Sequence, residues 1–284
     1  MTRAEHPVAE PKPTRHEVDR VRPEMPLVDV MDGDARREIR VLDHGFVALV
    51  DSMPRLVPEG QTADQAIVQA ARVSYGAGTK KVHEDHGLIR YLLRHRHTTP
   101  FEMVEFKFHC SMPIFVARQW IRHRTANVNE YSGRYSVMPD RFYRPEPGNV
   151  RVQSKSNRQG GEEPADAVTA SDFLAYLDRS ESLYEEYEAL VERGVSREQA
   201  RMALPVSLYT EWYWKCDLHN ILRFLSLRMD SHAQQEIRVF AEAMCALIEG
   251  IVPVTIEAWR DYDLGAMHLT RLEVEAIREG HAEL

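Results

Sequence analysis

The stretch from residue 119 to residue 136 constrains the fold more than any other, because it gathers charged and turn-forming side chains directly behind an apolar helix start. A proline followed by apolar residues is typical of a first helical turn. On such a helix Gln119, Arg122 and His123 are predicted to share one face, while Arg124 points nearly the opposite way. The fold must therefore present two guanidinium groups, each suited to a phosphate or a planar acceptor.

The residues that follow narrow the interpretation of these arginines. A basic helix end that merely complements the helix dipole explains residues 122–124 equally well when they are taken alone. Glu130, Ser132, Gly133 and Arg134 come next and supply a carboxylate, a hydroxyl, a glycine that permits close approach and a further cation. Such a set can surround a small polar anion.

The overall charge and the cysteines limit the function classes. A net charge of −8 argues against general nucleic-acid binding, so an anion site has to be a local basic pocket. A module for single-stranded nucleic acid that uses residues 122–134 is the alternative, but no pattern of stacking aromatics accompanies it.

Three cysteines far apart, without a CxxC pair, indicate a reducing compartment rather than a disulfide or zinc framework. No apolar run is long enough for a membrane span, so we expect a cytoplasmic protein without a membrane partner.

The hydrophobic pattern predicts an α+β fold, with a mostly antiparallel central sheet packed by helices in one domain. Residues 1–35 are rich in proline and charge and are predicted to form an extended or poorly ordered arm, and residues 36–284 the domain. A loop is predicted over 138–161. The other predicted elements are a hairpin over 37–51, strands over 103–111 and 208–214, and helices over 62–75, 82–96, 171–193, 196–204 and 217–230.

Several chemistries are disfavoured by the residues themselves. His95 and His97 could ligate a metal, but no third ligand of suitable spacing follows, so no metal site is predicted. No Gly-x-Gly-x-x-Gly loop is present for a dinucleotide. Ser132 has no adjacent base, and no cysteine has a clear activating neighbour. A cofactor must then carry the difficult step while the protein supplies orientation and charge. Trp212 and Trp214 are interpreted as core residues.

These residues also carry a resemblance to a known family. Arg122-His123-Arg124, a gap of seven residues and Ser132 resemble the RHR-x7-S signature of the flavin-dependent thymidylate synthases, and residues 129–136 are similar to its extension. Residues 97–102 are similar to the family's second block, and Ser74 to a further flavin-side position. Residues 201–205 and 227–237 are similar to its C-terminal half. The resemblance covers roughly residues 38–262.

The resemblance implies reductive methylation of dUMP to dTMP, with methylenetetrahydrofolate as carbon donor, FAD as hydride carrier and NADPH as reductant. It implies active sites between the subunits of a homotetramer, and a catalytic Arg228 that stabilises the uracil as an anion at N3. A nucleotide-sensing homologue that has lost turnover is the remaining alternative. The implied dUMP contacts are Gln119, Trp120, Ile121, Arg122, Glu130, Tyr131, Ser132, Gly133, Arg134, Arg201 and Arg228. The implied FAD contacts are Ser74, His97, Thr99, Arg122, His123, Arg124, Glu130, Asp217, Leu218, His219 and Arg223.

Overall fold

The structure is a computed structural model that describes residues 37–55, 57, 59–73, 85–155, 160–267 and 269–280. The predicted arm of residues 1–35 and the predicted flavin contact Ser74 lie outside the described residues. Among the described helices, none is both long enough and apolar enough to cross a bilayer.

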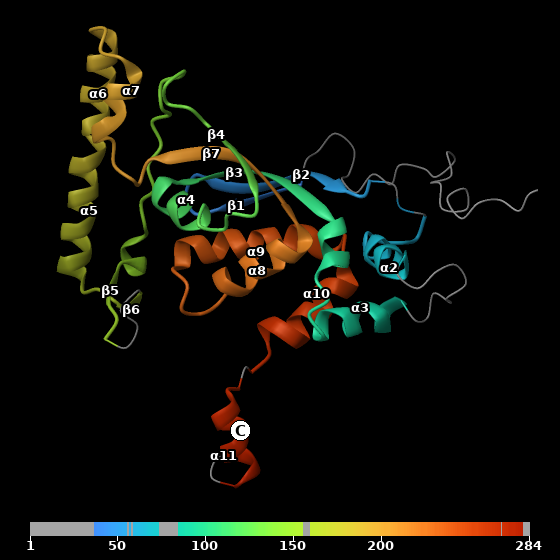
Figure 1. Ribbon diagram of the computed structural model, residues 1–284. Helices are drawn as coiled ribbons and strands as arrows, with labels where there is room; N and C mark the ends of the chain where they lie inside the picture. Colours follow the sequence, from blue (N-terminus) through green and yellow to red (C-terminus); the bar gives the residue numbers. More distant parts are fainter. Residues whose placement is uncertain are drawn as a thin grey trace, which may run out of the picture.

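A five-stranded antiparallel sheet lies at the centre of the fold, in the strand order β1-β2-β3-β7-β4 (Figure 1). The predicted α+β class and its antiparallel sheet are confirmed, as is the hairpin formed by the first two strands. The strands are β1 (Glu38–Val41), β2 (Gly45–Met53), β3 (Glu105–Pro113), β4 (Asn127–Glu130) and β7 (Tyr209–Asp217).

Alternation along β3 separates a buried face of the sheet from a charged one. Phe106, Phe108 and Cys110 are completely buried on the face that carries the helices. On the other face Lys215 Nζ lies 2.8 Å from a Glu105 carboxylate oxygen on the neighbouring strand. Successive side chains of a strand point to opposite faces of the sheet. A shift by one residue would therefore bury the charged side chains, so the pattern specifies the register between β3 and β7.

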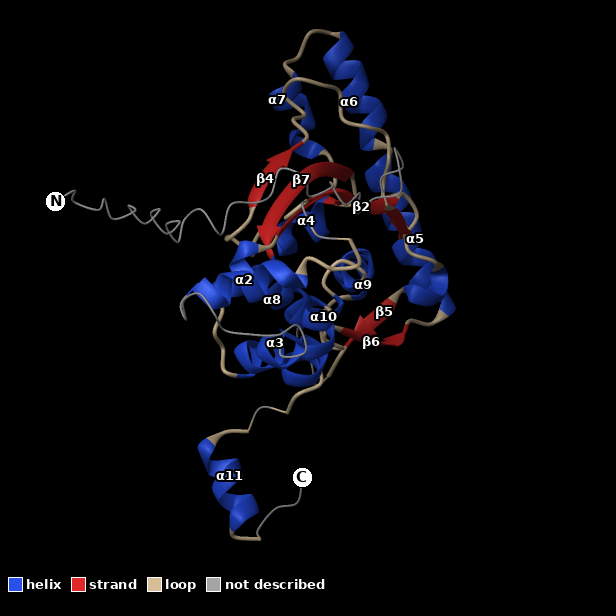
Figure 2. Ribbon diagram, turned by 90° about the vertical axis from the view of Figure 1, so that its right-hand side faces the viewer, coloured by secondary structure: helices blue, strands red, loops and turns tan. Residues whose placement is uncertain are grey.

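Three helices cover the apolar face of the sheet: α4 (Ile114–Trp120), α8 (Leu218–Arg228) and α9 (Gln235–Glu249) (Figures 1 and 2). Trp120 stacks on Phe224 with ring centroids 4.9 Å apart, so α4 and α8 meet through aromatic rings. Trp212 and Trp214 are 2% and 1% exposed in the same core, which confirms their interpretation as core residues.

A second group of helices packs at one end of the sheet. Asp64 is buried, and its carboxylate accepts hydrogen bonds from the backbone N–H groups of Val254 and Thr255 at 3.0 and 3.1 Å, which fixes the start of α10. This group and the C-terminal segment comprise α2 (Asp64–Val73), α3 (Asp85–Arg94), the 3₁₀ turn η2 (Thr99–Met103), α10 (Pro253–Trp259), the π-helical turn η5 (Arg260–Leu264) and α11 (Arg271–Arg278).

The segment between β4 and β7 departs from its prediction in three ways. The helix predicted over 171–193 begins earlier, after the cap Asp166, and is divided at Ser182, whose hydroxyl donates to the Arg179 carbonyl at 2.8 Å. The apolar side chain of Phe173 predicts burial within this helix, yet it is 39% exposed. The predicted loop over 138–161 contains a strand. The elements here are η3 (Pro147–Asn149), β5 (Arg151–Gln153), β6 (Gly161–Pro164), α5 (Ala167–Glu181), α6 (Leu183–Glu192), α7 (Arg197–Ala200) and η4 (Arg201–Ala203).

Candidate active site

The helix that was predicted to carry Gln119, Arg122 and His123 on one face is shorter than expected. The helix α4 ends at Trp120, whose indole is completely buried, and the His123 N–H donates to the Trp120 carbonyl at 3.0 Å in a turn. The prediction that these three residues share a helix face is therefore wrong, because Arg122 and His123 lie in the turn between α4 and β4. Sequence periodicity missed this stop because no glycine or proline marks it.

Arg228 and His123 meet across that turn, at the C-terminal end of α8. Arg228 Nε donates to His123 Nε2 at 3.2 Å, and the imidazole packs edge-on against Phe224 at 4.9 Å. Desolvation, followed by the positive charges of Arg228 and Arg223, lowers the pKa of His123 from 6.5 to about 4. The imidazole is therefore neutral near pH 7, accepts at Nε2 and carries its proton on Nδ1.

The guanidinium of Arg228 has a second anchor on α4. Its Nη2 donates to the Gln119 carbonyl oxygen at 3.4 Å, and the Gln119 amide donates in turn to Gln234. Burial lowers the pKa of Arg228, which means that its charged form is held partly out of water. A desolvated cation with neutral protein acceptors favours a bound anion.

Glu130 lies at the end of the edge strand β4, opposite Trp212 on β7. Thr210 is buried, and its hydroxyl donates to Glu130 Oε1 at 2.9 Å. The side chain of Glu130 is itself exposed, so the carboxylate is oriented by the sheet while it faces outward. Sequence patterns missed β4 because it is short and polar, with Val128 as its apolar residue.

The loop after β4 brings the predicted Ser132–Gly133–Arg134 group to Arg201. A Cβ on Gly133 would lie 2.6 Å from the sulfur of Met138 and 3.2 Å from Cδ of Arg201, so glycine permits this approach. Tyr131, another predicted contact, donates from its hydroxyl to the Val137 carbonyl at 2.7 Å and closes the loop.

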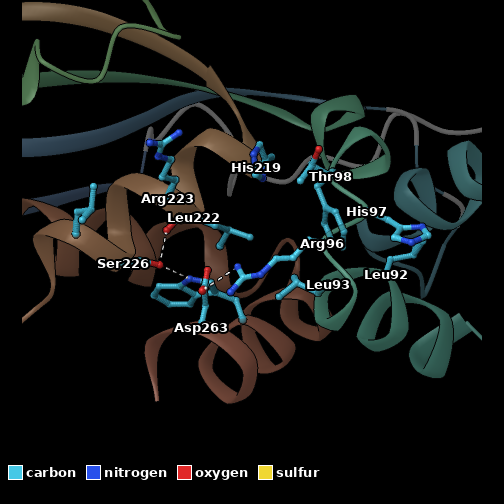
Figure 3. Close-up of a pocket in the computed structure, with 13 residues that line it drawn as sticks. Leu92, Leu93, Arg96, His97, Thr98, His219, Leu222, Arg223, Ser226 and Asp263 are labelled. Carbon is cyan, nitrogen blue, oxygen red and sulfur yellow. Dashed lines mark hydrogen bonds and ion pairs between the residues drawn. The ribbon is translucent and has the colours of Figure 1, made fainter. Parts of the chain in front are cut away.

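A cavity of about 370 Å³ lies between the end of α3, α8 and η5 (Figure 3). Three predicted flavin contacts, His97, His219 and Arg223, line it together, although they are far apart in the sequence. Arg96, Thr98 and Asp263 were not predicted. The first two belong to the polar run 95–102, which was a usable signal, whereas nothing in the sequence marks Asp263. The complete lining is Leu92, Leu93, Arg96, His97, Thr98, Phe101, His219, Leu222, Arg223, Ser226, Leu227, Trp259 and Asp263.

Some predicted contacts have side chains engaged elsewhere. Trp120 and Leu218 are completely buried in the core, so their backbone is what remains available to a ligand. The carboxylate of Asp217 caps α8 by accepting from the Asn220 backbone N–H at 2.9 Å. Arg122 and Arg124 are exposed, Ile121 is half-buried, and Thr99 opens η2 beside the cavity.

The predicted site residues thus form separate groups within one chain. Across the described part of the chain, no hydrogen bond or ion pair joins the Gly133–Arg201 group to the Arg228–His123 group. The described residues also contain no cluster of three potential metal ligands of the His, Cys, Asp or Glu type.

The three cysteines are poorly suited to nucleophilic catalysis. Cys110, Cys216 and Cys245 are all buried. Desolvation raises the pKa of Cys216 to about 12 and also raises the pKa values of the other two thiols. Because the thiolate is the nucleophile, none of these thiols is activated near neutral pH.

Comparisons with known proteins identify the family of this chain. The family described as "Thymidylate synthase complementing protein" matches residues 55–254. The chain is 65% identical over 263 residues to a flavin-dependent thymidylate synthase of Dictyostelium discoideum, covering 93% of this chain and 87% of the relative. It is 52% identical over 257 residues to the same-named protein of Gluconobacter oxydans, covering 89% and 82%.

A solved structure is similar in fold as well. The crystal structure of the UMP/dUMP methylase PolB from Streptomyces cacaoi, bound with 5-Br dUMP, matches with a TM-score of 0.69 and 34% identity. The match covers 80% of this chain and 99% of that one. A family match over most of the chain, close relatives and a shared fold lead to one conclusion: this chain is an enzyme of the flavin-dependent thymidylate synthase family.

Proposed function

We propose that the protein methylates dUMP to dTMP, with methylenetetrahydrofolate as carbon donor, FAD as hydride carrier and NADPH as reductant. The names of its relatives and the dUMP analogue bound to PolB support this substrate and a flavin. The observation that carries the proposal is the half-buried Arg228 guanidinium, held by the neutral His123 and the Gln119 carbonyl.

Arg228 is the proposed catalytic residue because it offers a desolvated positive charge to a planar anion. A uracil ring that becomes negative at N3 is stabilised by such a charge more strongly than a neutral ring is. His123 accepts from Nε and Gln119 accepts from Nη2, so both contacts orient the guanidinium plane. The protein thereby supplies charge stabilisation without a nucleophilic thiol.

The phosphate of dUMP is proposed to bind at the loop after β4. Ser132, Gly133 and Arg134 supply a hydroxyl, a backbone that can be approached closely and a guanidinium, and Arg201 lies beside Gly133. Glu130, oriented by Thr210, is proposed to lie between dUMP and flavin.

The cavity beside α8 fits a flavin. Leu93 and the exposed Leu227 offer apolar surface for a planar ring, and Arg223 offers a cation for phosphate. His97, which follows α3, and His219 on α8 line the same cavity. When bound, the flavin would supply the hydride chemistry that no side chain of the protein can provide.

A homotetramer with sites between subunits is proposed to unite the separate groups. Arg228 with His123 would come from one subunit and Gly133 with Arg201 from another, since no described contact joins them within one chain. Methylenetetrahydrofolate and NADPH would reach the flavin from the open side of the cavity.

The test is dTMP formation by the purified protein in the absence of oxygen, followed by chromatography. We expect product with dUMP, methylenetetrahydrofolate, FAD and NADPH together, and loss of product when any one of them is omitted. Arg228→Ala should abolish product, whereas Arg193→Ala, a change at an exposed helix end, should not. A protein that binds dUMP but forms no dTMP under any of these conditions would contradict the proposal and favour a nucleotide sensor.

A further inference from the structure

Arg96 follows α3 in a backbone conformation that arginine seldom adopts. Its φ angle is 59°, in the left-handed region that normally favours glycine or asparagine. The N–H of Arg96 donates to the Leu93 carbonyl at 3.1 Å, and the N–H of His97 donates to the Leu92 carbonyl at 2.9 Å. These bonds end the helix, and glycine would make them at lower cost. An arginine here is therefore explained by its side chain rather than by its backbone.

That side chain makes a contact across the cavity. Arg96 Nη1 donates to Asp263 Oδ1 at 3.0 Å, and the two residues are 167 positions apart in the chain. Figure 3 shows the Arg96 side chain running across the cavity from the end of α3 towards η5. A ligand that fills this cavity has to displace the side chain or bind it.

The ion pair between Arg96 and Asp263 is weak enough for another anion to replace Asp263. The side chain of Arg96 is 58% exposed and that of Asp263 is 22% exposed, and such solvated pairs contribute little to stability. A phosphate offers more acceptor oxygens and more negative charge than one carboxylate, and the guanidinium fork matches it. Arg223 points in another direction in Figure 3, so Arg96 is a separate cation.

We propose that Arg96 is a further binding residue of the flavin cavity: Asp263 holds it across the cavity in the free protein, and a phosphate of the dinucleotide replaces Asp263 on binding. This inference rests on the proposed function, because it takes the dinucleotide to be FAD. The rest of the cavity agrees, since the accessible side chains of Leu93 and Leu227 can contact a planar ring while Arg96 takes the attached anion.

The competing explanation is a structural strap that ties α3 to η5. Arg90 provides the matched control, because it joins α3 to Asp261 of the same turn and to Glu257 at 3.0 Å, yet does not line the cavity. Arg90→Gln removes a strap of this kind. Arg96→Gly and Arg96→Asn remove the guanidinium but suit the left-handed backbone, and Arg96→Lys keeps the charge.

The experiment is equilibrium dialysis of the full-length apoprotein with FAD and with riboflavin, which lacks phosphate, beside thermal unfolding of each variant. Arg96→Gly and Arg96→Asn should weaken FAD binding about 10- to 100-fold and change riboflavin binding less than about twofold. The FAD affinity of Arg96→Lys should lie between the affinities of these two variants and that of the unchanged protein. Arg90→Gln should leave both affinities unchanged. The melting temperature of Arg96→Gly should stay within about 3 °C of the unchanged protein.

Asp263→Asn tests whether Asp263 and the phosphate compete for Arg96. If Asp263 competes with the phosphate, this variant should bind FAD several-fold more tightly; weaker binding would overturn the competition. Equal FAD affinities for Arg96→Gly and the unchanged protein would overturn the role of Arg96 while leaving flavin-dependent dTMP formation intact. An unchanged protein that binds neither flavin would overturn the proposed function and this inference with it.

Discussion

Arg228 Nε donates a 3.2 Å hydrogen bond to His123 Nε2, which joins the end of α8 to the turn after α4. Arg228→Lys keeps a positive charge but cannot contact both His123 and the Gln119 carbonyl with a planar fork. We expect kcat/KM for dUMP to fall about 10- to 100-fold, and kcat to fall as well, because the charge acts on the developing anion. Steady-state kinetics of purified protein measure both.

The control for this substitution is Arg193→Lys at the exposed end of α6. It should leave both constants unchanged. A rise in KM for dUMP with kcat unchanged in Arg228→Lys would mean that Arg228 only binds the ground state, contrary to its proposed catalytic role.

The neutral His123 predicts a specific pH dependence of stability. Its pKa is about 4 in the folded protein and 6.5 when unperturbed, so the unfolded chain binds more protons between these values. The contribution of the neutral His123 to the free energy of unfolding is therefore lost as the pH falls from about 6.5 towards 4. In His123→Gln, which keeps an acceptor for Arg228, the free energy of unfolding should fall less over this window. Urea unfolding at several pH values measures it.

An exposed histidine supplies the comparison. His44→Gln, in the turn between β1 and β2, should retain the pH dependence of the unchanged protein. If His123→Gln loses stability at low pH as steeply as the unchanged protein does, His123 is not a neutral group in the fold.

Sites between subunits predict complementation between inactive variants. Arg228→Ala and Arg201→Ala should each be inactive, but a co-refolded mixture should regain activity, because about a quarter of randomly formed sites receive both intact groups. A mixture of Arg228→Ala with a variant in which both Arg228 and Arg201 are replaced by alanine should remain inactive, because no subunit in that mixture carries an intact Arg228. Activity assays of both mixtures make the comparison, and no recovery in the first mixture would place the whole site in one chain.

The buried cysteines predict that thiol reagents leave the enzyme active. Burial raises the pKa values of Cys110, Cys216 and Cys245, so Ellman's reagent should modify less than about one thiol in the native protein and three after unfolding. Activity should persist after native treatment. Rapid modification of one thiol with parallel loss of dTMP formation would instead indicate a cysteine mechanism.

Much of the scaffold could be predicted from the sequence because local patterns specify it. The alternation in β3 and β7 follows from side-chain period, the start of α8 from the capping carboxylate of Asp217, and the end of α6 from Gly194, whose φ is +91°. Each signal lies within a few residues of the structure that it specifies.

The departures come from tertiary contacts that no local pattern records. The helix α4 stops because the chain turns back after Trp120 to bring His123 to Arg228. The short polar strand β4 exists because β7 pairs with it. Asp263 joins the cavity through its contact with Arg96, from a part of the chain without any motif.

The most direct test of the central claim is the visible absorbance of the purified protein, followed without oxygen as NADPH is added with and without dUMP. A flavin band that bleaches, and bleaches faster when dUMP is present, is the predicted result, because the proposed site holds the nucleotide beside the flavin. A colourless protein that takes up no added FAD would contradict the claim that a flavin carries the hydride in this enzyme.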